Sequence, residues 1–73
     1  MKFKIIIKNG EESHISEVYE TDDDKFEHLK DTMIDSIKLK DPMGILLEDG
    51  DYIIFPSSYI ESSIIRLVTI EED

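Results

Sequence analysis

The chain contains no cysteine among its 73 residues and has few prolines and glycines. The absence of cysteine excludes a disulfide framework, a thiolate zinc site and a cysteine nucleophile. The length leaves room for a single domain, residues 1–73, whose stability is expected to be marginal because a chain this short buries only about 60% of its unfolded surface. Self-association is the remaining way to add stability.

Long apolar runs and basic residues are also scarce. No run of about 18 apolar residues occurs, and the N-terminus lacks a signal-peptide core, so we expect a cytoplasmic protein without a membrane span. Eight basic residues against 18 acidic ones give a formal charge of −10. Such a charge argues against direct binding to nucleic acid or anionic lipid. The plentiful Ile, Leu, Val and Phe exclude an acidic disordered tail.

Alternation at the start of the chain predicts a β-hairpin. Residues 2–8 place Phe3, Ile5 and Ile7 on one face and lysines mostly on the other. Asn9-Gly10 then predicts a two-residue type I′ turn, with residues 12–19 as the returning strand. In that register Lys4 lies opposite Ile15, so neither face of the ribbon is purely apolar.

The lysines of the first strand form a local basic strip, which is expected to be neutralised rather than to bind phosphate. The returning strand carries acidic residues opposite the lysines, and opposite charges across two strands attract one another. The basic residues are Lys2, Lys4 and Lys8, and the acidic ones are Glu11, Glu12 and Glu17.

A single amphipathic helix is predicted after Thr21, which is placed to cap its first turn. Asp22, Asp23 and Asp24 lie where the helix dipole favours negative charge, and Asp41-Pro42 ends the helix. The apolar residues recur at spacings of three and four, as one face of a helix requires. They are Phe26, Leu29, Met33, Ile34 and Ile37.

The last third of the chain predicts a second hairpin and a final strand. Asp49-Gly50 is expected to form the hairpin tip, with Leu47 opposite Tyr52 and Ile45 opposite Ile54. Residues 56–61 predict a short turn in which Ser58 and Glu61 have capping-box spacing. The closing segments are a strand from Ile64 to Ile70 and the acidic end Glu71-Glu72-Asp73.

The predicted order is strand, strand, helix and three strands (ββαβββ), which indicates an α+β fold. We expect a mainly antiparallel sheet with one amphipathic helix packed on one face. One helix cannot cover both faces of about five strands, so the surplus apolar residues predict an interface, unless a strongly curled sheet buries them internally. The candidate interface residues are Ile6, Ile15, Leu46, Ile53, Phe55, Ile65 and Leu67.

Few residues suggest chemistry, and none is assigned a catalytic, metal-binding or cofactor-binding role. His14 lies near two serines in composition only, and the acids of Glu48–Asp51 fit a solvated hairpin tip. A weaker alternative is a metal-dependent enzyme that uses His28 with Asp24 and Asp31, although a surface ion pair explains their helical spacing. No P-loop, dinucleotide-binding, nucleophile-elbow or zinc-protease motif is present.

In outline the chain resembles small uncharacterised proteins of Gram-positive bacteria and their phages. The resemblance is carried by the lysine-rich first strand with Asn9-Gly10, the single helix, and residues 52–69 with Pro56 and Tyr59-Ile60. It covers most of the chain but contains no diagnostic motif, so it transfers no functional residue. It implies accessory or phage-related biology.

The apolar surplus, together with the missing catalytic motifs, predicts a non-enzymatic protein–protein interaction module. We expect it to form a homodimer through a sheet face or edge and to bind another cytosolic protein. The alternative is a nucleic-acid mimic, in which the acids of the helix and of Glu48–Asp51 imitate phosphates in the groove of a DNA-binding protein.

Overall fold

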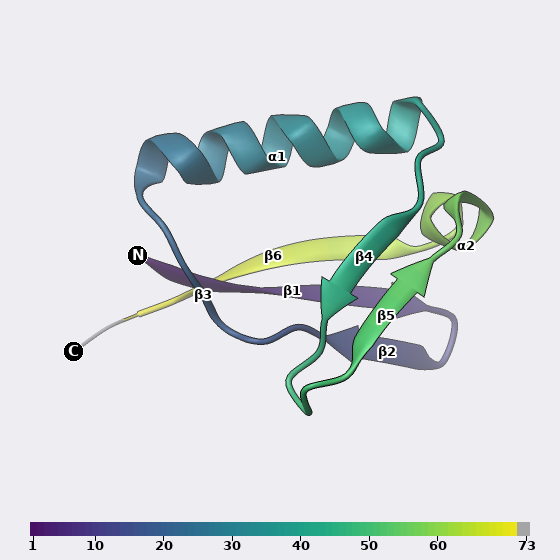
Figure 1. Ribbon diagram of the computed structural model, residues 1–73, viewed down its shortest axis with the longest axis horizontal. Helices are drawn as coiled ribbons and strands as arrows, with labels where there is room; N and C mark the ends of the chain where they lie inside the picture. Colours follow the sequence, from purple (N-terminus) through teal and green to yellow (C-terminus); the bar gives the residue numbers. More distant parts are fainter. Residues whose placement is uncertain (72–73) are drawn as a thin grey trace.

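The computed structural model describes residues 1–71 as a curled antiparallel sheet covered on one face by a long helix, which runs roughly along β1 and β6 (Figure 1). This arrangement confirms the predicted α+β class; Glu72 and Asp73 of the predicted acidic end lie outside the described residues. The elements are β1 (Lys2–Asn9), β2 (Glu12–Ile15), β3 (Tyr19–Glu20), α1 (Asp23–Lys38), β4 (Met43–Leu46), β5 (Tyr52–Phe55), α2 (Ser57–Glu61) and β6 (Ile64–Ile70).

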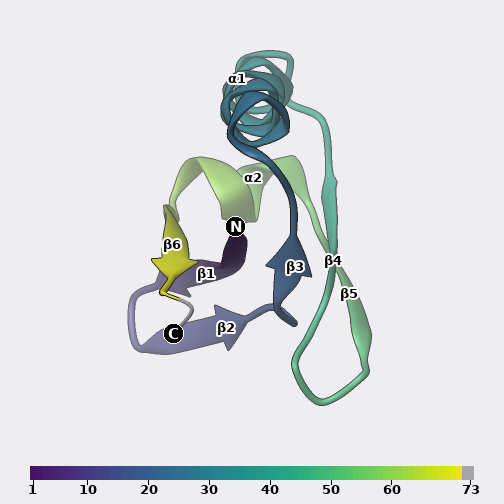
Figure 2. The ribbon, with the colours of Figure 1, turned by 90° about the vertical axis from the view of Figure 1, so that its left-hand side faces the viewer.

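Strand β1 is the centre of the sheet. It pairs along its length with β6 on one side and with β2 and β3 on the other, all antiparallel. The β4–β5 hairpin joins this sheet through an antiparallel bridge between Ser16 and Leu47. Viewed along the strands, the hairpin rises beside the sheet toward α1, so the strands curl under the helix (Figure 2).

The first hairpin turns one residue later than predicted. Asn9 pairs with Glu12, so Gly10 and Glu11 form the two-residue loop. Gly10 has φ 61° and Glu11 has no positive φ, which is the requirement of a type II′ turn rather than the predicted type I′. The pairing shifts by two residues, to Ile6 with Ile15, and a two-residue shift keeps every side chain on its expected face.

The predicted returning strand is interrupted at Ser16, where the backbone changes partner. The Ser16 N–H donates to the Ile5 carbonyl at 2.9 Å, while the Ser16 hydroxyl oxygen accepts the Ile5 N–H at 2.7 Å. The next residue, Glu17, donates its N–H to Leu46 of β4 instead of β1. One continuous strand over 12–19 is therefore wrong, because this segment links two ladders and the buried hydroxyl replaces a backbone carbonyl.

The second hairpin is displaced by one residue from the predicted pairing. Leu46 pairs with Tyr52, and the Leu47 N–H donates to the Asp51 carbonyl at 2.7 Å, so the loop holds three residues, 48–50. The loop ends at Gly50, whose φ of 95° fits the left-handed position of such loops. A one-residue shift exchanges the two faces of a strand. Phe55 therefore faces the core at 3% exposure, and Ile54 faces outward at 66%.

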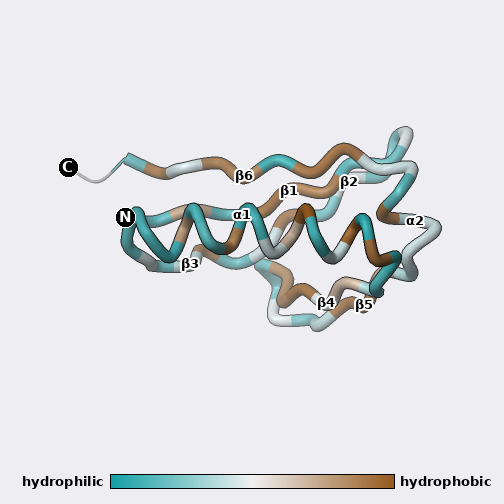
Figure 3. Tube along the Cα trace, turned by 90° about the horizontal axis from the view of Figure 1, so that it is seen from above, coloured by the Kyte–Doolittle hydropathy of each residue, from teal (hydrophilic) through white to brown (hydrophobic). Residues whose placement is uncertain are grey.

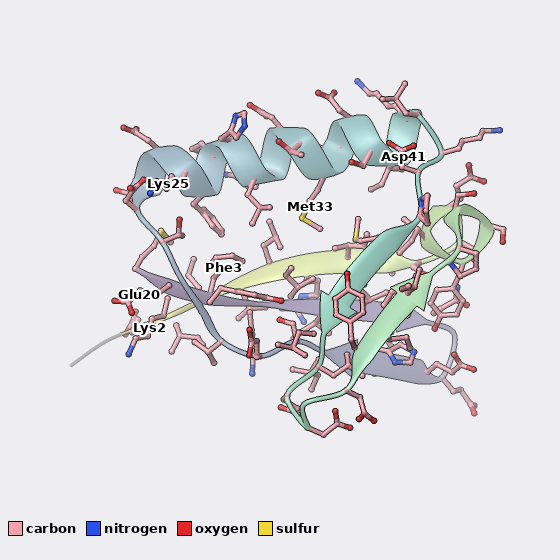
Figure 4. The ribbon with its side chains drawn as sticks, viewed as in Figure 1. Lys2, Phe3, Glu20, Lys25, Met33 and Asp41 are labelled. Atoms are coloured by element: carbon pink, nitrogen blue, oxygen red, sulfur yellow. The ribbon has the colours of Figure 1, made fainter. Side chains whose placement is uncertain are left out.

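Helix α1 packs on the inner face of the sheet, as predicted from its apolar spacing. Phe26 and Met33 are buried, and Leu29 and Ile37 pack beside them, whereas Ile34 remains 50% exposed. Figure 4 shows Met33 pointing from the helix toward the sheet above Phe3. The buried core consists of Phe3, Ile5, Ile7, Phe26, Met33, Ile45, Phe55 and Ile60.

The caps of both helices differ from the sequence prediction. The N-cap of α1 is Asp22, whose carboxylate accepts the Lys25 N–H at 2.8 Å, and Thr21 does not cap it. Helix α2 begins after Pro56 and has no side-chain cap, so the predicted capping box of Ser58 and Glu61 is wrong. Asp22 is a better cap than Thr21, because its negative charge also interacts favourably with the positive end of the helix dipole.

Asp22→Ala is expected to lower the free energy of unfolding by about 1 kcal/mol, because it removes the cap of α1. Thr21→Ala is the matched control, and it should change the stability by less than about 0.5 kcal/mol. Urea denaturation of both variants measures the difference. Equal losses would contradict the assignment of Asp22 as the cap.

Candidate interaction surfaces

A polar cluster of side chains joins β2 to α2. The Tyr59 hydroxyl donates to the Glu12 carboxylate at 2.8 Å and lies 3.1 Å from His14 Nε2. The rings of His14, Phe55 and Tyr59 pack together, with Tyr59 stacked on Phe55 at 5.2 Å between centroids. Asn9 completes the cluster by donating to the Tyr59 carbonyl at 3.2 Å.

The chemistry of this cluster suits a structural role, in which it holds β2 and α2 together. Desolvation, followed by the hydrogen bond to Glu12, raises the pKa of the Tyr59 phenol above its ordinary value. The phenol therefore stays neutral and donates a hydrogen bond at neutral pH, rather than acting as a base or nucleophile. His14 makes no hydrogen bond with Ser13 or Ser16, so the three side chains do not form a nucleophile–base arrangement.

The other candidate chemical groups stay apart from one another. His28 is exposed on α1, and no hydrogen bond or ion pair joins it to Asp24 or Asp31. At the hairpin tip, the Asp49 carboxylate accepts the Asp51 N–H at 2.9 Å, as in a solvated turn. Within residues 1–71, no three His, Asp or Glu side chains converge as metal ligands would. Neither helix in that range combines the length and apolar character needed to cross a bilayer.

The structure divides the seven predicted interface residues into three groups. Phe55 is buried in the core, so its predicted exposure is wrong; the one-residue shift of the second hairpin is the reason. Ile53, Ile65 and Leu67 are partly buried against the core on the inner side of the strands. The other three are half-buried and face away from the helix; they are Ile6, Ile15 and Leu46.

The outer edge of β6 carries unpaired backbone groups. Ile5 of β1 directs both its N–H and its carbonyl toward Ser16, away from β6. In an antiparallel ladder the backbone direction alternates along each strand, so Ile5 and its partner Leu67 do not bond to each other. The N–H and C=O groups of Ile65, Leu67 and Thr69 therefore point outward, and β6 pairs with β1 alone among the described strands.

An apolar groove runs beside this edge, between α1 and β6. It has a volume of about 360 Å³, and helix residues form one wall while β6 forms the other. In Figure 3 the helix lies above β1, with β6 outermost on one side and the β4–β5 hairpin on the other. The lining residues are Lys30, Met33, Ile34, Ile37, Ile65 and Leu67. The free edge and the groove form one continuous surface, which we call the β6 edge surface.

The β6 edge surface lacks the features that usually protect a sheet edge from pairing. Protected edges are short, bulged, or interrupted by proline and lysine. Strand β6 is seven residues long and pairs with β1 without a bulge. Its sequence contains no proline, and Arg66 is its one charged residue. This is the longest apolar strand edge available for pairing in residues 1–71.

Comparisons with known proteins found no matching family model, no matching curated protein and no matching solved structure. The resemblance to small proteins of Gram-positive bacteria and phages therefore remains a prediction. The apolar surplus predicts Ile65 and Leu67 from the sequence but not Ile34, whose helical spacing indicates burial. It also missed Thr69, since outward backbone groups follow from strand pairing and leave no signal in the residue type.

Proposed function

We propose that the protein is a non-enzymatic interaction module that forms a homodimer by pairing the β6 edges of two copies. The observation that carries the proposal is the unprotected β6 edge beside the groove of α1. Burial of such an edge satisfies backbone groups and removes apolar surface from water in the same step. The dimer would then act in the cytosol by binding another protein.

One antiparallel register uses every outward-facing group. With Leu67 on the two-fold axis, Ile65 of one copy lies opposite Thr69 of the other, and all three residues exchange backbone hydrogen bonds. Arg66 then lies opposite Val68, so the two positive charges do not meet. The two grooves join across the axis, where the exposed Ile34 gains an apolar neighbour.

The size of this surface indicates moderate affinity. A single strand pair with one helix face is smaller than the standard interface of about 1,600 Å², and small interfaces belong to weak or transient complexes. The domain itself is expected to be marginally stable, so dimerisation would add to its apparent stability as concentration rises. A dissociation constant in the micromolar range fits both considerations.

Sedimentation equilibrium of the wild-type chain across the micromolar range tests the proposal. We expect the average mass to rise from the 8.5 kDa of one chain to twice that value. Because the contact consists mainly of backbone bonds and apolar side chains, raising the salt concentration should not abolish the dimer. A chain that remains monomeric throughout this range would sink the homodimer proposal.

The nucleic-acid mimic is the second candidate, and the charge distribution favours it less. Mimicry needs carboxylates gathered on one face, but Lys25, Lys30 and Lys38 lie among the acids of α1. Lys30 also pairs with Glu27 at 2.7 Å, which neutralises part of the acidic helix surface. The other acids that a mimic would use are spread along α1 from Asp23 to Asp35 and over a separate element, the hairpin tip at Glu48–Asp51.

A further inference from the structure

The open face of the sheet, on the side away from α1, has a regular pattern of charge and apolarity. Each cross-strand pair between β1 and β6 on this face joins one basic residue to one β-branched residue. Among residues 1–71 no helix covers this face, because α1 and the core lie on the opposite side (Figure 1), and its side chains are half-buried or exposed. The pairs are Lys2 with Ile70, Lys4 with Val68, Ile6 with Arg66, and Lys8 with Ile64.

The face concentrates positive charge on an acidic protein. It holds four of the eight basic residues of a chain whose net charge is −10. The acids expected to neutralise the strip lie mostly elsewhere, because Glu12 pairs with Asn9 on the inner side and Glu11 lies in the turn. Glu20 does lie opposite Lys2, and Figure 4 shows the two side chains close together at the end of the sheet.

Apolar side chains continue across the pattern. Ile15 extends the row of Ile6 onto β2, and Ile64 at the end of β6 is 66% exposed. In the free protein, the aliphatic stems of the lysines can cover part of these apolar side chains, which explains how the residues can lie on a surface in contact with water. The same arrangement also presents a charged group and an apolar group together in every row.

The occupant of a sheet face must satisfy its own backbone hydrogen bonds, because the face offers side chains and no free backbone groups. An α-helix meets this requirement, and helices commonly cover sheet faces in layered folds. Four rows of side chains span roughly 20 Å along a strand, the length of a helix of about 14 residues. The acidic helix α1 of another copy does not fit, since its apolar stripe is already packed on its own sheet.

We infer that the open sheet face is the docking site for an acidic amphipathic helix of a partner protein. Carboxylates of the helix pair with Lys4, Lys8 and Arg66, and its apolar stripe covers Ile6 and Ile15. The inference names the partner of the proposed interaction module and does not require the β6 dimer. Charge complementarity selects an acidic partner, while the apolar half of the pattern favours a protein segment over a polyanion such as DNA.

Selection from a phage-displayed library of about 14-residue helical peptides tests this inference. The wild-type protein should enrich peptides with acidic residues beside an apolar stripe, and their binding should weaken as salt concentration rises. A variant with Lys4→Glu, Lys8→Glu and Arg66→Glu should bind the selected peptides at least about tenfold more weakly. The matched control is Lys25→Glu, Lys38→Glu and Lys40→Glu, which makes the same charge change on and beside α1 and should retain binding.

Three other results would overturn the inference. They are the absence of any enrichment, enriched peptides that bind the sheet-face variant as well as the wild type, and binding of a short DNA duplex or phosphatidylglycerol vesicles in place of peptides. Circular dichroism and thermal unfolding establish that both triple variants are folded. Sedimentation of the same variants distinguishes peptide binding by the sheet face from dimerisation. The variants should still form the dimer, because β6 edge pairing uses backbone groups that the substitutions leave unchanged.

Discussion

Phe55→Ala is expected to remove most of the stability of the domain, with a loss of about 3 to 5 kcal/mol in the free energy of unfolding. The Phe55 side chain is 3% exposed and stacks on Tyr59, so its truncation leaves a cavity beneath the β4–β5 hairpin and removes a ring contact. Small domains have total stabilities of about 5 kcal/mol or a little more. The variant should therefore be largely unfolded near physiological temperature.

Ile54→Ala is the matched control, because Ile54 lies next to Phe55 but is 66% exposed. Its loss should not exceed about 1 kcal/mol, the range of strand preference at an exposed position. Urea denaturation at one protein concentration measures both variants, since dimerisation changes apparent stability with concentration. A larger loss for Ile54→Ala than for Phe55→Ala would mean that the hairpin pairs in the register predicted from the sequence.

Thr69→Pro is expected to dissociate the homodimer while leaving the monomer folded. The Thr69 N–H points away from β1, and proline is tolerated in an edge strand where the N–H faces solvent. In the dimer the substitution removes one backbone hydrogen bond from each copy. At about 1 kcal/mol per bond, the dissociation constant should rise roughly thirtyfold, and the proline ring should weaken the contact further.

Thr69→Val retains the backbone N–H and should preserve the dimer, so it is the control for this position. Sedimentation equilibrium compares the two variants with the wild type, and circular dichroism shows whether each is folded. If Thr69→Pro and the wild type have the same association constant, the contact between copies does not involve this edge.

Residue patterns predicted the element types in this chain well. The period-two alternation of β1 and the helical spacing of Phe26 and Met33 each placed the correct side chains in the core. These predictions succeed because the repeat of a regular element depends on local geometry alone. The same reasoning predicted the α+β class and a helix on one face of the sheet.

Register and strand partners were predicted less well, because they depend on turns and on distant segments. Asp49-Gly50 indicated a tight turn, yet the loop takes a third residue, and that difference moved Phe55 from the surface into the core. The break at Ser16 requires β4 as a second partner, which no local pattern reveals. Hairpin signals thus locate a turn more reliably than they fix the faces of its strands.

The candidate surfaces were likewise predicted only in part: the residue types gave a correct signal, but the strand partners did not follow from them. The apolar surplus pointed to Ile65 and Leu67, which line the groove, but it could not show that β6 lies at the edge of the sheet. The basic strip of β1 was expected to be neutralised by β2. In the observed register, Lys8 is exposed and lies opposite Ser13 instead, whereas Lys2 has an acidic residue, Glu20, opposite it.

The proposed homodimer requires β6 to pair with the β6 of a second copy at Leu67, and a single cysteine tests this contact directly. The wild-type chain has no cysteine, so Leu67→Cys introduces the only thiol. Residues that exchange hydrogen bonds across antiparallel strands have Cα atoms about 5.5 Å apart, which is within the range of a disulfide.

Thr69→Cys is the control, since its mate would lie four residues away along the paired strand, roughly 13 Å. Mild oxidation at micromolar concentration should link Leu67→Cys into a covalent dimer and leave Thr69→Cys largely unlinked, although Thr69 is the more exposed side chain. Equal linking of the two variants, or faster linking of Thr69→Cys, would contradict the proposed β6 dimer.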